Sequence, residues 1–187
     1  VPQGVDSPGV ESLVRRGLPL VFVDRRVPSV DSVPFVVSDP YPGIRSAVAE
    51  LMRLGHRRIG YVSHPALGSF SVNEREVAFR AITGELLADG ETIVVNCDAT
   101  YESRQRALDE LAESGMSAVV FAYSPDAITM LGLMTDRGLE VGADMSVVSF
   151  DDIAAFTMMT PSVSVISQQA ETMGRQCVEL LMRQLAG

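Results

Sequence analysis

Several of the apolar runs in this sequence end in polar side chains that could hold a small molecule. If the runs are parallel strands, their carboxyl ends meet at one edge of a sheet, where ligands of such proteins bind. Carboxylates accept hydrogen bonds from neighbouring hydroxyl groups, and a guanidinium donates hydrogen bonds in a fixed fork, so this set suits a polyhydroxylated or otherwise polar molecule. The candidates are Asp24, Arg75, Tyr123, Ser124 and Asp151, together with the small and polar residues of the segment 63–71.

Structural explanations compete with the binding interpretation for several of these residues. An aspartate at the end of a strand is often a turn or helix-capping residue, which applies to Asp24 and Asp151 alike. Arg75 lies between two glutamates, so a solvent-exposed helix face would also account for it. His56 follows a glycine and most simply caps the preceding helix. His64 lies in a loop and has no partner nearby in the sequence.

The common sequence motifs of enzymes are missing. The chain contains no nucleophile elbow, no P-loop, no G-x-G-x-x-G, no H-E-x-x-H and no C-x-x-C. Asp151 and Asp152 could bind Mg²⁺, but no phosphate-binding loop lies near them in the sequence. Cys97 and Cys177 lie far apart and match no metal-ligand or redox spacing. We therefore predict a binding protein and not an enzyme, with no cofactor and no metal site.

The elements that would position the candidate residues alternate between strand and helix, which is typical of parallel sheets covered by helices. Apolar runs predict the strands, stripes of apolar residues three and four apart predict the helices, and Ser124 is expected to cap a helix that begins at Pro125. The predicted strands are 19–23, 33–37, 58–62, 92–95, 118–122, 146–150 and 163–166, and the predicted helices lie near 44–52, 77–82, 103–113, 124–138 and 173–181.

Charge and composition exclude some classes of protein. The 187 residues carry 15 basic and 24 acidic side chains, a formal net charge of −9, which argues against a surface on this chain that neutralises nucleic-acid phosphates. No stretch approaches the roughly 20 apolar residues that span a bilayer, so no membrane partner is expected. The two cysteines fit reduced thiols in a cytoplasmic protein. The chain does not begin with Met and stops at the end of a predicted helix, so we interpret both ends as cut.

Six motifs, in order along the whole chain, resemble the lactose/galactose-repressor (LacI/GalR) family. They are Leu18–Asp24, Val37–Asp39, Leu54–Tyr61, Arg75–Phe79, Gly138–Asp152 and Pro161–Gln168. The resemblance implies the α/β fold of type I periplasmic binding proteins, with two Rossmann-like lobes of parallel sheets, three crossovers and an effector bound between the lobes. It also implies that the first lobe is incomplete: residues 1–62 and 167–187 would form part of the N-terminal lobe, and residues 63–166 the C-terminal lobe.

The resemblance also assigns roles to individual residues. Asp24 and Arg75 correspond to effector contacts, Asp151 to the acidic ligand anchor, and Gln168 to a crossover near the cleft. Ser69 and Ser71 occupy positions where family members place polar contacts.

The sequence departs from the family pattern at several of these points. Tyr123 and Ser124 replace the usual Asn-Asp pair, and Ala99 replaces an aromatic residue that often stacks on the ligand. Ala78 and Ser149 each replace a glycine. These changes predict a pocket that differs from a standard sugar site.

Two functions follow as alternatives from the resemblance. The first is the effector-sensing domain of a cytoplasmic, dimeric repressor that responds to a sugar or related metabolite and contacts operator DNA only through a helix-turn-helix headpiece absent from this chain. The second is a periplasmic or lipoprotein solute-binding protein of a transporter. The motifs Gly55–Ile59 and Phe150–Asp152 favour the repressor. The stretch Val10, Leu13 and Val14 is a candidate apolar dimer surface.

Overall fold

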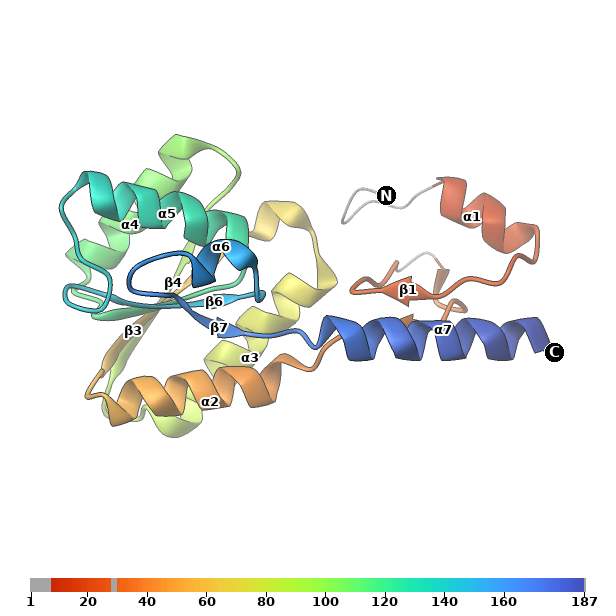
Figure 1. Cartoon of the computed structure of the whole chain (residues 1–187), viewed down its shortest axis with the longest axis horizontal. Helices are drawn as coiled ribbons and strands as arrows, with labels where there is room; N and C mark the ends of the chain where they lie inside the picture. The colour runs from red at the N-terminus through yellow and green to blue at the C-terminus, as the bar shows by residue number, and fades with distance from the viewer. Residues whose placement is uncertain (1–7, 28–29, 187) are drawn as a thin grey trace.

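The computed structural model describes residues 8–27 and 30–186 and shows two units of unequal size (Figure 1). The larger unit holds α2 (Pro40–Arg53), β3 (Arg58–Ser63), a 3₁₀ turn (Pro65–Leu67), α3 (Phe70–Leu86), β4 (Glu91–Asn96), α4 (Tyr101–Glu113), β5 (Ala118–Phe121), α5 (Ser124–Asp136), β6 (Ser146–Phe150), α6 (Ala154–Thr157) and β7 (Ser164–Ile166). The smaller unit holds α1 (Pro8–Arg15), β1 (Phe22–Val23), β2 (Phe35–Val36) and α7 (Ala170–Ala186).

The larger unit is built on a parallel sheet in the order β4-β3-β5-β6-β7. Side chains of a strand alternate between the two faces of its sheet. In β5, Val119 and Phe121 therefore join the core under α4 and α5, and Ala118 and Val120 join the core under α2 and α3. Burial of both faces explains why this segment of the sequence is continuously apolar.

The smaller unit contains one parallel strand pair with a helix on either side of it (Figure 1). Met173 and Cys177 of α7 pack with Val36 of β2, and Val10 of α1 packs with a separate group of valines from the 27–33 segment. Val10 is buried and Val14 packs against the same group, so these two side chains face the interior of their own unit and are not free to form a dimer surface.

The boundary between the units lies elsewhere than the resemblance implied. The segment 58–62 was assigned to the first lobe, but β3 pairs with β4 on one side and β5 on the other. The helix α2 packs with α3 on this same sheet. Both elements therefore belong to the larger unit, and the expected boundary at residue 62 is corrected to the connection before Pro40. An apolar strand in the sequence carries no signal of which sheet it will join.

Local sequence signals explain where several elements begin and end. The Asp39 side chain accepts a hydrogen bond from the backbone N–H of Tyr41 (3.0 Å) and caps α2, which ends before Gly55 at a positive φ of 97°. The predicted cap of α5 is wrong by one residue, because Tyr123 is the N-cap and Ser124 is the first helical residue. The Ser124 hydroxyl has another partner, described below. No helix in the described ranges is long and apolar enough to cross a membrane.

Candidate functional site

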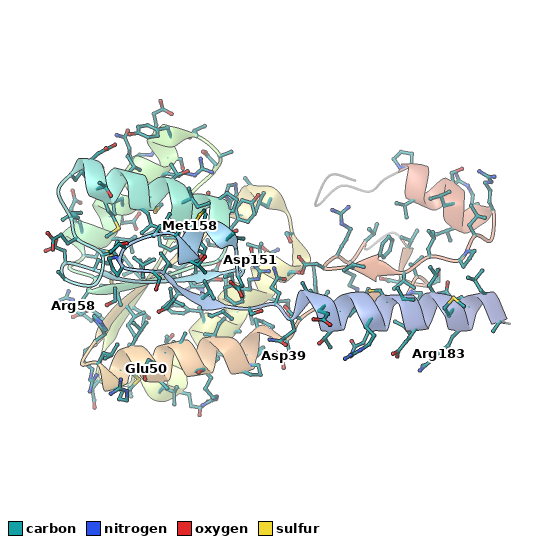
Figure 2. The ribbon with its side chains drawn as sticks, viewed as in Figure 1. Asp39, Glu50, Arg58, Asp151, Met158 and Arg183 are labelled. Atoms are coloured by element: carbon teal, nitrogen blue, oxygen red, sulfur yellow. The ribbon has the colours of Figure 1, made fainter. Side chains whose placement is uncertain are left out.

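Four polar side chains converge where β6 ends. Figure 2 shows one of them, Asp151, at the side of the larger unit that faces the smaller one. The Asp151 carboxylate accepts hydrogen bonds from the Ser124 hydroxyl (3.2 Å) and from Nε2 of Gln168, and it lies 3.8 Å from Nη2 of Arg75. These partners come from the start of α5, the crossover after β7 and the first turns of α3. The backbone of Asp151 has φ of 73°, a left-handed conformation that Asp and Asn tolerate better than most residues.

Arg75 is a buried member of this group. Its side chain is 3% exposed, Nη1 donates to the carbonyl of Ala122 (2.6 Å), and its Cζ lies 4.4 Å from the centre of the Phe150 ring. The alternative of a solvent-exposed helix face is therefore wrong for Arg75. Its neighbour Glu76 faces other partners, accepting from the Ser63 hydroxyl at 2.7 Å.

A second contact connects the two units. The Ser71 hydroxyl at the start of α3 donates to the backbone carbonyl of Asp24 (3.2 Å), which follows β1 in the smaller unit and has φ of 52°. Two acceptor atoms in this region, Oδ1 of Asp24 and Oε1 of Gln168, are buried and have no hydrogen-bond partner among the described residues. Buried acceptors without partners are unfavourable, and a bound molecule with hydroxyl or amine groups would satisfy them.

The two remaining predicted site residues have other surroundings. Ser69 is the buried N-cap of α3, and its hydroxyl makes no capping hydrogen bond within the described part of the chain. The ring of Tyr123 packs edge-on against His64, with ring centres 5.6 Å apart. Neither side chain is hydrogen-bonded to the Asp151 group in the residues that the structure describes.

Sequence reasoning missed a buried polar cluster at the same edge of the sheet. His64 Nδ1 lies 2.7 Å from Oδ2 of Asp126, and Nε of Arg104 donates to Oδ1 of that carboxylate (2.8 Å). Cys97 completes the cluster, and burial together with the adjacent Asp126 carboxylate raises the pKa of its thiol. Each of these residues except Arg104 follows a strand closely, so the rule that found Asp24 and Asp151 would have found them too.

The expected role of His56 is corrected. Its ring nitrogens contact the hydroxyls of Ser117 (2.8 Å) and Ser146 (3.0 Å) from neighbouring strand starts, so the side chain does not cap α2. Burial lowers the pKa of His56 below its ordinary value.

A cavity of about 850 Å³ runs along β7 and α2, at the free edge of the sheet. Gln168 and Phe150 line it, but Asp151, Arg75 and Asp24 do not. The polar groups that could recognise a ligand therefore converge beside this cavity and not inside it.

Residues 48–187, well over half of the chain, match the model of the periplasmic binding protein-like domain family. The chain belongs to this family. The transcriptional regulator MalR of Streptomyces coelicolor is 29% identical over 186 residues, which are 97% of this chain and 54% of that protein. The transcriptional regulator CelR of Thermobifida fusca gives the same identity and the same shares. The chain thus spans about half the length of the curated relatives it matches.

Solved structures show the same architecture. A probable LacI family transcriptional regulator from Corynebacterium glutamicum superposes with a TM-score of 0.83 at 28% identity, over 94% of this chain and 67% of that one. A LacI family regulator from Enterococcus faecium with bound ribose gives 0.82 at 21% identity, over 99% and 69%. The periplasmic-binding-protein-like fold and the resemblance to the LacI/GalR effector-binding core are confirmed.

Proposed function

We propose that this domain is the effector-sensing part of a LacI-type transcription regulator and binds a small hydroxyl-rich molecule at the junction of its two units. The observation that carries the proposal is the pair of buried acceptors without partners among the described residues: Oδ1 of Asp24, which follows β1, and Oε1 of Gln168, which lies in the crossover between the units. A sugar or related polyol offers several hydroxyl donors at short spacing, so one molecule could satisfy both acceptors.

The neighbouring groups provide complementary contacts for such a ligand. Arg75 can donate hydrogen bonds, and Asp151 can accept them if its bonds to Ser124 and Gln168 rearrange. The bound ribose of the Enterococcus faecium regulator supports a sugar of this size as the class of effector.

The same proposal covers the partners of the whole protein. Operator DNA would be contacted by a helix-turn-helix headpiece outside this chain, and the net charge of −9 supports this because it disfavours binding of the sensing domain to phosphates. The regulator works as a cytoplasmic homodimer, and exposed apolar residues of α7 support a dimer face: Val178, Met182 and Leu185 are each about 60% exposed. The site binds its effector without chemical conversion.

A solute-binding protein of a transporter remains the second candidate, because the family model describes a periplasmic binding protein-like domain. The names of the curated relatives favour the regulator, since MalR, CelR and GalR of Escherichia coli are all called transcriptional regulators.

Asp24→Asn provides the sharpest test of the site. Asn keeps the shape and tolerates the positive φ, and because Oδ1 has no internal partner, the substitution breaks no described hydrogen bond of that atom. The melting temperature of the empty protein should therefore stay unchanged. A panel of pentoses, hexoses and disaccharides is first screened by thermal shift, and a hit is titrated by calorimetry. We expect Asp24→Asn to weaken binding of the hit by about tenfold to a thousandfold.

The matched control is Asp152→Asn, an exposed aspartate beside the site that should leave binding unchanged. Equal affinities of the wild type and Asp24→Asn for the hit would place the ligand elsewhere. A panel in which no sugar or polyol raises the melting temperature at millimolar concentration would contradict the effector class.

A further inference from the structure

Three side chains that commonly bind metal ions meet under the sheet edge described above, although each follows a different strand. His64 follows β3, Cys97 follows β4, and Asp126 lies in the first turn of α5, after β5. One imidazole nitrogen, the thiol sulfur and one carboxylate oxygen lie within 4.8 Å of one another, and no member is more than 4% exposed. We propose that these residues bind a divalent transition metal ion of the Zn²⁺ type, against the expectation from cysteine spacing that the chain has no metal site.

The donor set and its dimensions fit such an ion. Nitrogen, sulfur and oxygen ligands together suit Zn²⁺ and Co²⁺, and poorly suit Mg²⁺ or Ca²⁺, which take oxygen ligands. With metal–ligand distances of about 2.0–2.3 Å, the donors of a tetrahedral site lie about 3.3–3.6 Å apart. His64 Nδ1 and Asp126 Oδ2, now 2.7 Å apart, would have to separate by roughly half an ångström. Three protein ligands would leave a fourth position for water or another small ligand.

Arg104 does not block the site, because it uses the other oxygen of the carboxylate. Nε and Nη2 of Arg104 each lie 2.8 Å from Oδ1 of Asp126, which leaves Oδ2 for the ion. A partner on the second oxygen is the usual way in which proteins orient a ligating carboxylate. The Arg104 side chain is 13% exposed, so the cluster has a partner that reaches the surface.

The charges around the ion can be balanced by residues of the cluster. Binding replaces the thiol proton of Cys97, because a coordinating thiol is deprotonated outright, and the neutral imidazole carries its proton on Nε2. A dication with the Cys97 thiolate, the Asp126 carboxylate and the Arg104 guanidinium has a net charge of +1. Asp98, the next residue after Cys97 in the sequence, adds a negative charge that offsets this remaining charge.

The site is distinct from the proposed effector site and does not depend on it. It connects the residues that follow β3 and β4 with the first turn of α5, where Ser124, two residues before Asp126, belongs to the proposed effector site. His64 also packs on Tyr123. Without a metal, hydrogen bonds from His64 and Arg104 to Asp126 hold the cluster closed. The competing account is that this closed network is purely structural and binds no ion.

Cobalt titration separates the two accounts. The whole protein is reduced, stripped of metal with a chelator and titrated with Co²⁺, which absorbs in the visible when tetrahedral and gives a sulfur-to-metal band in the near ultraviolet when bound to a thiolate. We expect both signals at one equivalent, and Zn²⁺ should abolish them by displacement. Cys97→Ser should remove the near-ultraviolet band, and both Cys97→Ser and His64→Gln should weaken Co²⁺ binding by about tenfold or more.

The chain provides a matched control for each variant, since it has two cysteines and two histidines. Cys177→Ser and His56→Gln should retain the band and the affinity of the wild type. A sulfur band that survives Cys97→Ser or disappears in Cys177→Ser would overturn the assignment, as would a wild type that binds no Co²⁺. X-ray absorption on the zinc-loaded wild type needs no variant: one sulfur at about 2.3 Å supports the site, and a shell without sulfur refutes it.

Discussion

Replacement of Asp151 by Asn removes one charge from the centre of the candidate site and one of the two oxygens that accept hydrogen bonds from Ser124 and Gln168. Asn has the same shape and also tolerates the φ of 73°, so the backbone should be unstrained. The loss falls on Arg75, whose side chain is 3% exposed and whose Nη2 lies 3.8 Å from the carboxylate. The change in the free energy of unfolding of Asp151→Asn therefore measures how much the Asp151 charge stabilises the buried Arg75 guanidinium.

The size of the effect follows from the geometry. Two unit charges 3.8 Å apart attract by about 4 kcal/mol at an effective dielectric constant of about 20. The net loss is smaller, because the Asp151 side chain is 22% exposed and Arg75 keeps its bond to the Ala122 carbonyl. We expect the free energy of unfolding of the empty protein to fall by about 1–3 kcal/mol. For a chain of this size the melting temperature should fall by about 3–10 °C.

Urea unfolding followed by circular dichroism measures the free energy directly, with calorimetry for the melting temperature. Asp152→Asn is the control, because Asp152 is exposed and has no hydrogen bond or ion pair among the described residues; its unfolding free energy should stay within about 0.5 kcal/mol of the wild type. If both variants have the free energy of unfolding of the wild type, the Asp151 charge does not stabilise Arg75, and the contacts among these side chains contribute nothing measurable to stability.

Three further outcomes are expected. Gly60→Ala should lower the free energy of unfolding by about 1–3 kcal/mol, because the added Cβ would overlap the Leu111 side chain. Gly84→Ala lies in open space on a helix and should raise the free energy of unfolding by up to about 1 kcal/mol, and the same urea titration measures both. Since burial lowers the pKa of His56, the unfolded chain binds a proton before the folded chain as the pH falls. The free energy of unfolding should therefore decrease as the pH falls through the ordinary histidine value of about 6.5, and His56→Gln should flatten this slope. Footprinting at low salt should show no sequence-specific protection of DNA by this chain, whose net charge is −9.

The strands and helices of the larger unit could be predicted because each carries its own local signal. The apolar run at 118–122 contains β5, and the helix expected at 103–113 is α4. The first strand was predicted too long: β1 covers only Phe22–Val23 of the expected 19–23, since hydrogen bonds to a single partner strand of two residues define it. Local sequence signals thus predict where a helix or strand lies more accurately than they predict its first and last residues.

Long-range partners could not be predicted, since they depend on how the strands are ordered in the sheet. His64 and Asp126 are 62 residues apart and become neighbours only because β3 and β5 are adjacent. The same holds for the His56 ring, which reaches Ser146 across 90 residues. The rule that polar residues follow parallel strands placed these residues at one edge of the sheet, but it could not say which of them would contact one another.

The contacts around Asp151 have a consequence for how tightly any effector binds. In the described structure the carboxylate already has Ser124 and Gln168 as donors, so a ligand that takes it over must break those bonds before it makes its own. The gain from that exchange is small, because one set of hydrogen bonds replaces another. Asp24 Oδ1 and Gln168 Oε1 begin without partners, so each new bond to them adds its full value. Affinity should therefore depend most on the donors of the ligand that reach these two atoms, and selectivity on whether one molecule can reach both.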